Sequence, residues 1–92
     1  MTGVLIKSFA KFRDEFGAER KIEAPHAATI YDCLILFAGM VPAAQTRLFE
    51  NGALKGHVVF MYNGERIDAE DASEITVEDG DEIVLYPPVS GG

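Results

Sequence analysis

The sequence contains a single cysteine, Cys33, and no tryptophan, and acidic residues outnumber basic ones. One cysteine excludes both an internal disulfide and a zinc site built from cysteines. Eight Lys and Arg against fifteen Asp and Glu give a net charge of −7. This charge argues against nucleic-acid binding, which requires clustered basic side chains. The N-terminal residues show no secretory signal and no membrane-spanning run, so we expect a cytoplasmic protein that makes no membrane contact.

The sequence also lacks the motifs of catalytic and cofactor sites. It has no nucleophile elbow, no phosphate-binding loop and no dinucleotide fingerprint. Neither His26 nor His57 has carboxylates or cysteines around it at ligand spacing, and the acidic residues after Ile67 do not follow calcium-loop spacing. Cys33 lies beside an apolar helix face, which favours a buried structural residue over a reactive thiol. We therefore expect no bound metal and no catalytic centre in the domain itself.

Short segments rich in β-branched and aromatic residues alternate with turn signals in this chain of 92 residues. They predict strands, or shorter extended pieces, at residues 4–9, 20–24, 57–62, 65–67, 74–77 and 82–86. Asn63-Gly64 and Asp79-Gly80 are dipeptides of the kind that tight turns prefer. We expect a charged turn at residues 10–17, in which Phe12 and Phe16 are core residues, and an acidic loop at residues 68–73.

One long helix is expected from Ile30 to Ala38, because Thr29 can cap its first turn together with Asp32 three residues later. Apolar residues recur at the spacing of one buried helix face: Ile30, Leu34, Phe37 and Val41. Gly39 is expected to end this helix. Pro42 is expected to begin a shorter second helix, which runs to Leu48 or Phe49 before Asn51-Gly52 closes it.

The end of the chain is the most distinctive stretch. A buried strand at residues 82–86 precedes Pro87-Pro88, and neither proline can donate to a strand ladder. Residues 89–92 show no apolar periodicity, so we expect a domain at residues 1–88 and a flexible tail at 89–92 that reaches roughly 13 Å when extended. Gly91-Gly92 would let a terminal carboxylate enter a narrow enzyme site. Small chain ends are common, so the diglycine alone is a weak signal.

The order of the elements predicts the fold class. Two hairpins on either side of one long helix can close into a mixed sheet of four to five strands, with the first and last strands as central neighbours. Such a sheet packed on one long helix and a short second helix is an α+β fold of the ubiquitin-like β-grasp type.

Three segments of the chain resemble the MoaD/ThiS family of sulfur carriers: residues 6–14, 59–65 and 79–92. The ending Pro-Pro-Val-Ser-Gly-Gly is the most specific part and favours a MoaD-like member, the small subunit of molybdopterin synthase. The resemblance covers most of the chain. It departs at Ala38 to Gly56, which is longer than in compact members.

The resemblance implies a carrier protein and not an enzyme. Gly92 would be adenylated with ATP by an E1-like (MoeB-like) enzyme, and a persulfide donor would convert it to a thiocarboxylate. The sulfur would go to a pterin precursor in the MoaE-like large subunit of molybdopterin synthase, for the molybdenum or tungsten cofactor. ATP is used by the activating enzyme, and the chain itself binds no cofactor.

Partner contact is expected from the tail, its root and one aromatic residue: Pro87, Pro88, Val89, Ser90, Gly91 and Phe60. Basic groups that hold the tail carboxylate are expected on the partner, whereas acidic residues of this chain would steer association at the rim.

Three alternatives stay open. A ubiquitin-like modifier would join the Gly92 carboxylate to lysines of other proteins. A ThiS-like carrier would deliver sulfur to the thiazole of thiamine or to another product. An interaction domain with an idle tail predicts no ATP-dependent activation.

Overall fold

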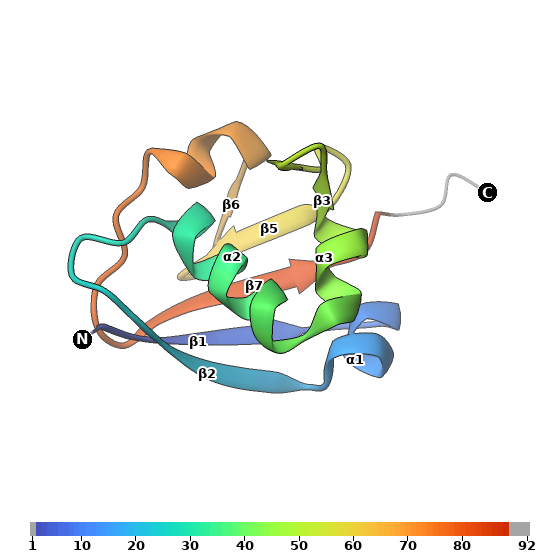
Figure 1. Ribbon diagram of the computed structural model, residues 1–92, viewed down its shortest axis with the longest axis horizontal. Helices are drawn as coiled ribbons and strands as arrows, with labels where there is room; N and C mark the ends of the chain where they lie inside the picture. The colour runs from blue at the N-terminus through green and yellow to red at the C-terminus, as the bar shows by residue number, and fades with distance from the viewer. Residues whose placement is uncertain (1, 89–92) are drawn as a thin grey trace.

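The computed structural model describes residues 2–88. Its elements, in chain order, are β1 (Thr2–Ser8), α1 (Lys11–Phe16), β2 (Glu19–Ala24), α2 (Ile30–Met40), α3 (Pro42–Leu48), β3 (Phe49–Glu50), β4 (Ala53–Leu54), β5 (Val59–Tyr62), β6 (Glu65–Ile67), the 3₁₀ helix η1 (Ala69–Ser73) and β7 (Asp81–Tyr86). Five strands form one mixed sheet in the order β2-β1-β7-β5-β6, and β3 and β4 form a separate two-stranded ribbon (Figure 1).

The first and last strands are central neighbours, as the sequence predicts. β1 pairs parallel with β7, while β1–β2, β5–β6 and β5–β7 are antiparallel pairs. Ser8 lies opposite Leu85, and the N–H of Phe9 donates to the carbonyl of Leu85 at 3.1 Å. The C-terminal ends of β1 and β7 therefore lie side by side, so Pro87 and Pro88, which follow β7, line one hollow with residues of α1, which follows β1.

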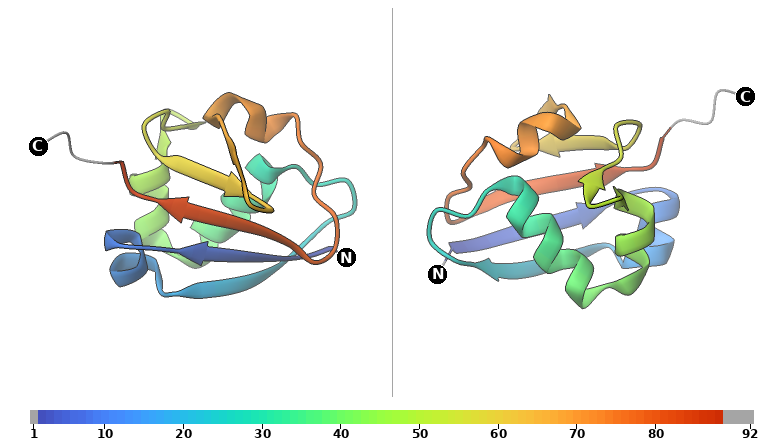
Figure 2. Two further views of the ribbon diagram at one scale, coloured as in Figure 1. Left: turned by 180° about the vertical axis from the view of Figure 1, so that it is seen from behind. Right: turned by 45° about the horizontal axis from the view of Figure 1, so that its top comes forward.

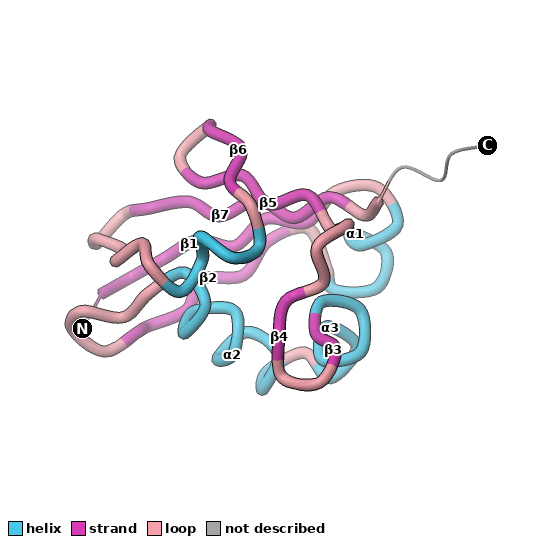
Figure 3. The backbone as a smooth tube through the Cα atoms, turned by 90° about the horizontal axis from the view of Figure 1, so that it is seen from above, coloured by secondary structure: helices cyan, strands magenta, loops and turns pink. Residues whose placement is uncertain are grey.

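Helices α2 and α3 cover one face of the sheet, and among residues 2–88 no helix covers the other face (Figures 2 and 3). The largest side chains of the core come from both layers and are fully buried: Phe37, Phe60, Ile6, Ile22, Ile30 and Leu34. Each contributes about 1.5–3 kcal/mol through removal of apolar surface from water. Within the described range, no helix has the length and apolar character needed to cross a membrane.

The predicted start of α2 is confirmed. The Asp32 N–H donates to Thr29 Oγ1 at 3.1 Å and the Thr29 N–H donates to Asp32 Oδ2 at 3.0 Å, which forms a complete capping box. The predicted stop at Gly39 is wrong, because α2 continues to Met40. The helix ends where Pro42 follows: proline restricts the residue before it to extended angles, and Val41 has φ −126° and ψ 91°.

The turn expected at residues 10–17 is mostly helix, since α1 spans Lys11–Phe16. α1 spans six residues, too few to be stable alone, so tertiary packing must hold it. Phe12 and Phe16 are buried as predicted and stack with ring centroids 4.8 Å apart, and Phe16 also meets the edge of Phe37 at 5.8 Å. These aromatic contacts tie α1 to α2.

Two other irregular segments carry more structure than the sequence suggests. The acidic loop at 68–73 is largely the 3₁₀ helix η1, which begins with a capping box between Asp68 and Asp71. Asn51-Gly52 does not close α3 but forms the turn of the β3–β4 ribbon, with φ of 53° and 81°. The extended piece expected at 74–77 is reduced to one bridge, between Thr29 and Thr76.

Asp81 joins the β5–β6 hairpin to the start of β7. Its carboxylate accepts hydrogen bonds from the Tyr62 hydroxyl, from Asn63 Nδ2 at 3.1 Å and from the Glu78 N–H at 2.7 Å. Partial burial raises the pKa of Asp81, but these hydrogen bonds to the charged form outweigh it and hold the pKa below its usual value. Burial, and then the hydrogen bond to Asp81, raise the pKa of Tyr62. The turn at Asn63-Gly64 is thus fixed against the sheet.

Candidate functional site

The candidate site is the root of the C-terminal segment, where β7 ends. Tyr86 is the last strand residue, Pro87 is half-buried and Pro88 is exposed, so the predicted strand stop is confirmed. The residues predicted to react or to contact a partner beyond this point lie outside the described residues: Val89, Ser90, Gly91 and Gly92. The visible part of the site is therefore the surface that surrounds the root.

An apolar patch on the open face of the sheet borders the root. Phe9 and Tyr86 stack with ring centroids 5.1 Å apart, and each keeps 38% of its surface exposed. Val59 lies directly opposite Tyr86, and Met61 lies opposite Val84, so these side chains share the open face. We call Phe9, Val59, Met61 and Tyr86 the outer patch. The outer patch thus places exposed apolar surface directly beside Pro87 and Pro88.

Phe60 does not belong to this patch, and its predicted contact with a partner is wrong. Its side chain is fully buried, and it lies opposite Ile67 and Leu85 on the face that α2 and α3 cover. Successive strand residues point to opposite faces, so a neighbour of Phe60 must point outward where Phe60 points inward. Val59 and Met61 therefore occupy the position that Phe60 was expected to take.

A hollow of about 460 Å³ adjoins the root on its other side. It is lined by Ala10, Lys11, Phe12, Glu15, Arg47, Lys55, His57, Pro87 and Pro88. Arg47 is held by Glu15, with Nη2 at 2.7 Å and Nε at 3.0 Å from the same carboxylate oxygen. Among residues 2–88, neither Lys11 nor Lys55 forms an ion pair. The sequence predicts acidic residues of this chain at the rim of the partner contact, whereas Glu15 is the one acidic residue of the described chain that lines this hollow. The basic groups expected on the partner stay a prediction.

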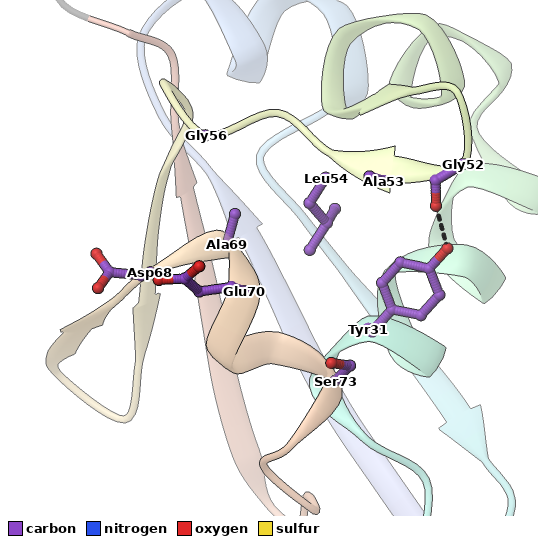
Figure 4. Close-up of a pocket in the computed structure, with 9 residues that line it drawn as sticks. All are labelled: Tyr31, Gly52, Ala53, Leu54, Gly56, Asp68, Ala69, Glu70 and Ser73. Carbon is purple, nitrogen blue, oxygen red and sulfur yellow. Dashed lines mark hydrogen bonds between the residues drawn. The ribbon is translucent and has the colours of Figure 1, made fainter.

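A second hollow, of about 720 Å³, lies away from the root between the β3–β4 ribbon, η1 and Tyr31 (Figure 4). The Tyr31 hydroxyl donates to the carbonyl of Gly52 and so ties α2 to the ribbon. The polar side chains of this hollow are hydroxyls and carboxylates, without a basic residue or a thiol. Across residues 2–88, no group of three or more His, Cys, Asp or Glu could hold a metal ion. The long segment from Ala38 to Gly56 forms the end of α2, the whole of α3 and the β3–β4 ribbon.

Cys33 is a buried residue, as the sequence predicts. Its side chain is fully buried in α2. Burial raises the pKa of the thiol to about 11, and the negative charges of Asp32 and Asp81 add to this effect. A neutral, enclosed thiol is a poor nucleophile. Sulfur chemistry at this residue is therefore disfavoured.

Comparison with known proteins places this geometry in a family. The ThiS family model matches residues 6–92. The chain is 34% identical over 88 residues to small archaeal modifier protein 1 of Haloferax volcanii, across 94% of this chain and 97% of that protein. The crystal structure of that modifier superposes with a TM-score of 0.86 at 33% identity, covering 98% and 99% of the two chains.

Two further solved structures share the fold along nearly their whole length. A putative molybdopterin converting factor subunit 1 from Pyrococcus furiosus gives a TM-score of 0.76 at 25% identity, over 97% of this chain and 100% of that one. A chain of the Amycolatopsis orientalis BexX/CysO complex gives 0.74 at 25% identity, over 97% and 99%. The predicted resemblance and the β-grasp fold are confirmed. With a family match that runs from β1 through the diglycine, the chain belongs to the ThiS family, whose members are ubiquitin-like carrier or modifier proteins and not catalysts.

Proposed function

We propose that this protein carries sulfur as a thiocarboxylate on Gly92. The observation that carries the proposal is the continuity of the family match through Gly92, combined with the position of β7 at the sheet centre. A carrier needs a rigid body that docks and a thin segment that enters an enzyme. β7 supplies the first, and Gly91-Gly92, which have no side chains, supply the second.

Activation begins at the terminal carboxylate. A carboxylate resists nucleophilic attack because its charge is delocalised, so an E1-like (MoeB-like) enzyme first transfers AMP from ATP to one carboxylate oxygen and releases pyrophosphate. The product is an acyl adenylate, in which AMP is a good leaving group. ATP binds to the activating enzyme, and this chain contributes the acyl group. These requirements are consistent with a cytoplasmic location, where ATP is available.

Sulfur then replaces AMP. The terminal sulfur of a persulfide attacks the acyl carbon of Gly92, AMP leaves, and an acyl disulfide remains. Attack by a second thiol on the donor's sulfur breaks the S–S bond, forms a disulfide between donor and thiol, and releases the thiocarboxylate. No thiol of this chain is required, in agreement with the buried and protonated state of Cys33.

The outer patch is the surface that we expect an enzyme partner to contact. Phe9 and Tyr86 are exposed aromatic residues beside the root, and such residues are enriched where protein interfaces carry binding energy. Pro87 and Pro88 continue directly from this patch into the tail. A partner that threads the tail can therefore cover the patch without any change in the sheet.

We further propose that the sulfur is delivered to a pterin precursor in the MoaE-like large subunit of molybdopterin synthase, for the molybdenum or tungsten cofactor. The likeness to the putative molybdopterin converting factor subunit of Pyrococcus furiosus supports this destination. The second candidate is protein modification, in which Gly92 is joined to lysines. The 34% identity to small archaeal modifier protein 1 of Haloferax volcanii favours it. Both functions use the same activated terminus.

The test is the intact mass of the protein isolated from its own cells and after incubation with ATP, the activating enzyme and a sulfur donor. We expect a mass gain equal to exchange of one oxygen for sulfur. Deletion of Gly92, or one residue added after it, should abolish this gain and leave the circular dichroism spectrum unchanged. Ser90→Ala, which keeps the diglycine, is the matched control. Sulfur donation by the Gly92-deleted chain would refute the proposal, and recovery of lysine-linked conjugates would favour the modifier.

A further inference from the structure

The surface beside Pro87 and Pro88 is basic, although the chain as a whole is acidic. Lys11, Arg47 and Lys55 line the hollow beside Pro87 and Pro88, so three of the eight Lys and Arg residues meet there. With Glu15 included, the hollow carries a formal charge of +2. Since the whole chain carries −7, the remainder carries −9. We call Lys11, Arg47, Lys55 and His57 the basic collar.

The basic collar is built from three separate parts of the chain. Lys11 is the first residue of α1 and Arg47 is in the last turn of α3, where Glu15 of α1 braces it. The N–H of Lys55 donates to the carbonyl of Leu48 at 2.8 Å, which holds the chain after β4 against the end of α3. Backbone elements of the fold thus carry the collar, in which Lys11 and Arg47 are exposed and Lys55 is half-buried.

The distance between the basic collar and the Gly92 carboxylate limits which ligands the collar can bind. The four residues after Pro88 span roughly 13 Å when extended. When the tail is threaded into an enzyme, the collar is therefore too far from the Gly92 carboxylate to hold the phosphates of ATP. It instead meets whatever surrounds the mouth of the channel that receives the tail, because Pro87 and Pro88 form one wall of the hollow.

We propose that the basic collar is a docking surface for carboxylate side chains at the mouth of the activating enzyme's tail channel. This inference rests on the proposed function. The remainder of the chain carries a net charge of −9, so carboxylates of a partner are attracted to the collar more than to the rest of the chain. Complementary charge of this kind favours the correct orientation and raises the association rate. The outer patch supplies apolar contact on one side of the root, and the collar supplies charge on the other.

The experiment compares two double variants with the same change in net charge. Lys11→Glu/Lys55→Glu reverses two charges of the collar and leaves the Arg47–Glu15 pair intact, whereas Arg20→Glu/Lys21→Glu reverses two exposed charges on the edge strand β2. The readout is the initial rate of ATP-dependent activation by the adenylating enzyme of the same genome, measured against carrier concentration at several salt concentrations. Circular dichroism checks that each variant is folded.

We expect the collar variant to raise KM at least about tenfold at low salt, with kcat unchanged, because the collar contacts the enzyme and not the reacting group. The difference in KM between the collar variant and the wild-type chain should become smaller as salt screens the charges. The edge-strand variant should change KM much less. Equal effects from both variants, or an unchanged KM in the collar variant, would overturn the inference. Faster activation of the collar variant would also overturn it, since the collar would then hold this chain's own carboxylate. If the wild-type chain is not activated at all, the proposed function fails, and the collar's role fails with it.

Discussion

The opposite roles of Phe60 and Tyr86 can be separated by two substitutions of similar cost to stability. Phe60 is fully buried, so Phe60→Ala should cost about 3–5 kcal/mol, a large part of the total stability of a domain of this size. Phe60→Leu keeps most of the volume and should cost about 1–2 kcal/mol. Tyr86→Ala removes the stacking contact with Phe9 and part of its buried area, which also amounts to about 1–2 kcal/mol. The second and third variants therefore remain folded at comparable stability.

The assay combines urea unfolding, followed by circular dichroism because the chain has no tryptophan, with the KM for ATP-dependent activation. We expect Phe60→Leu to keep a KM close to wild type, and Tyr86→Ala to raise it about tenfold, which corresponds to about 1.4 kcal/mol of lost partner binding. The opposite result, with Phe60→Leu impaired and Tyr86→Ala normal at matched stability, would refute the assignment of the outer patch.

Three further predictions concern residues away from the root. Asp81→Asn should lower the free energy of unfolding by about 1–2 kcal/mol at pH 7, because an amide cannot accept all three hydrogen bonds and Asp81 is only partly buried. The folded-state pKa of Asp81 lies below its unfolded value of about 3.9. The stability that the Asp81 carboxylate contributes is therefore present above pH 4 and is lost as the pH falls through the folded-state pKa. A difference in free energy of unfolding between wild type and Asp81→Asn that persists in strong acid, measured by urea titration, would contradict this. Cys33 should resist iodoacetamide at pH 8 until urea is added, and Cys33→Ala should still accept sulfur at Gly92; labelling of the native protein would contradict its burial. Thr29→Ala should lower thermal stability by about 1 kcal/mol through loss of the cap, whereas Thr46→Ala on the exposed side of α3 should change it little.

Local chemistry predicted those parts of the fold that depend on a few neighbouring residues. The capping box at Thr29 and Asp32 is present because both of its hydrogen bonds join residues three apart in sequence. The turns at Asn63-Gly64 and Asp79-Gly80 are present because asparagine and glycine tolerate the positive φ angles found there, 48° at Asn63, 88° at Gly64 and 90° at Gly80. The central pairing of β1 with β7 followed from element order and the handedness of the crossover. Caps and turns formed by residues close together in sequence, and the strand pairing that follows from element order, could therefore be predicted.

Features that depend on tertiary contact were missed. α1 lacks a side-chain cap and begins after Ala10 at φ 54°, so only the packing of Phe12 and Phe16 explains it. The sequence analysis placed Phe60 on the wrong face of the sheet. Alternating side chains divide a strand into two faces, but the alternation does not show which face the helices cover. Lys11 and Lys55 are far apart in sequence and become neighbours only when α1 and the chain after β4 meet. No local pattern could have revealed the basic collar.

The short tail has a consequence for how partners use this protein. An enzyme that reaches Gly92 must come within roughly 13 Å of Pro88, because the four residues after Pro88, the last of which is Gly92, span no more than that. We therefore expect an enzyme that acts on Gly92 to cover the outer patch and the basic collar, which lie on either side of the root. Under the proposed function, an activating enzyme and a sulfur acceptor would then compete for the same surface and could not be bound together. The carrier would have to dissociate from the first before it reached the second, so its affinity for each would have to permit release, which favours an interface of moderate size with charge that accelerates association.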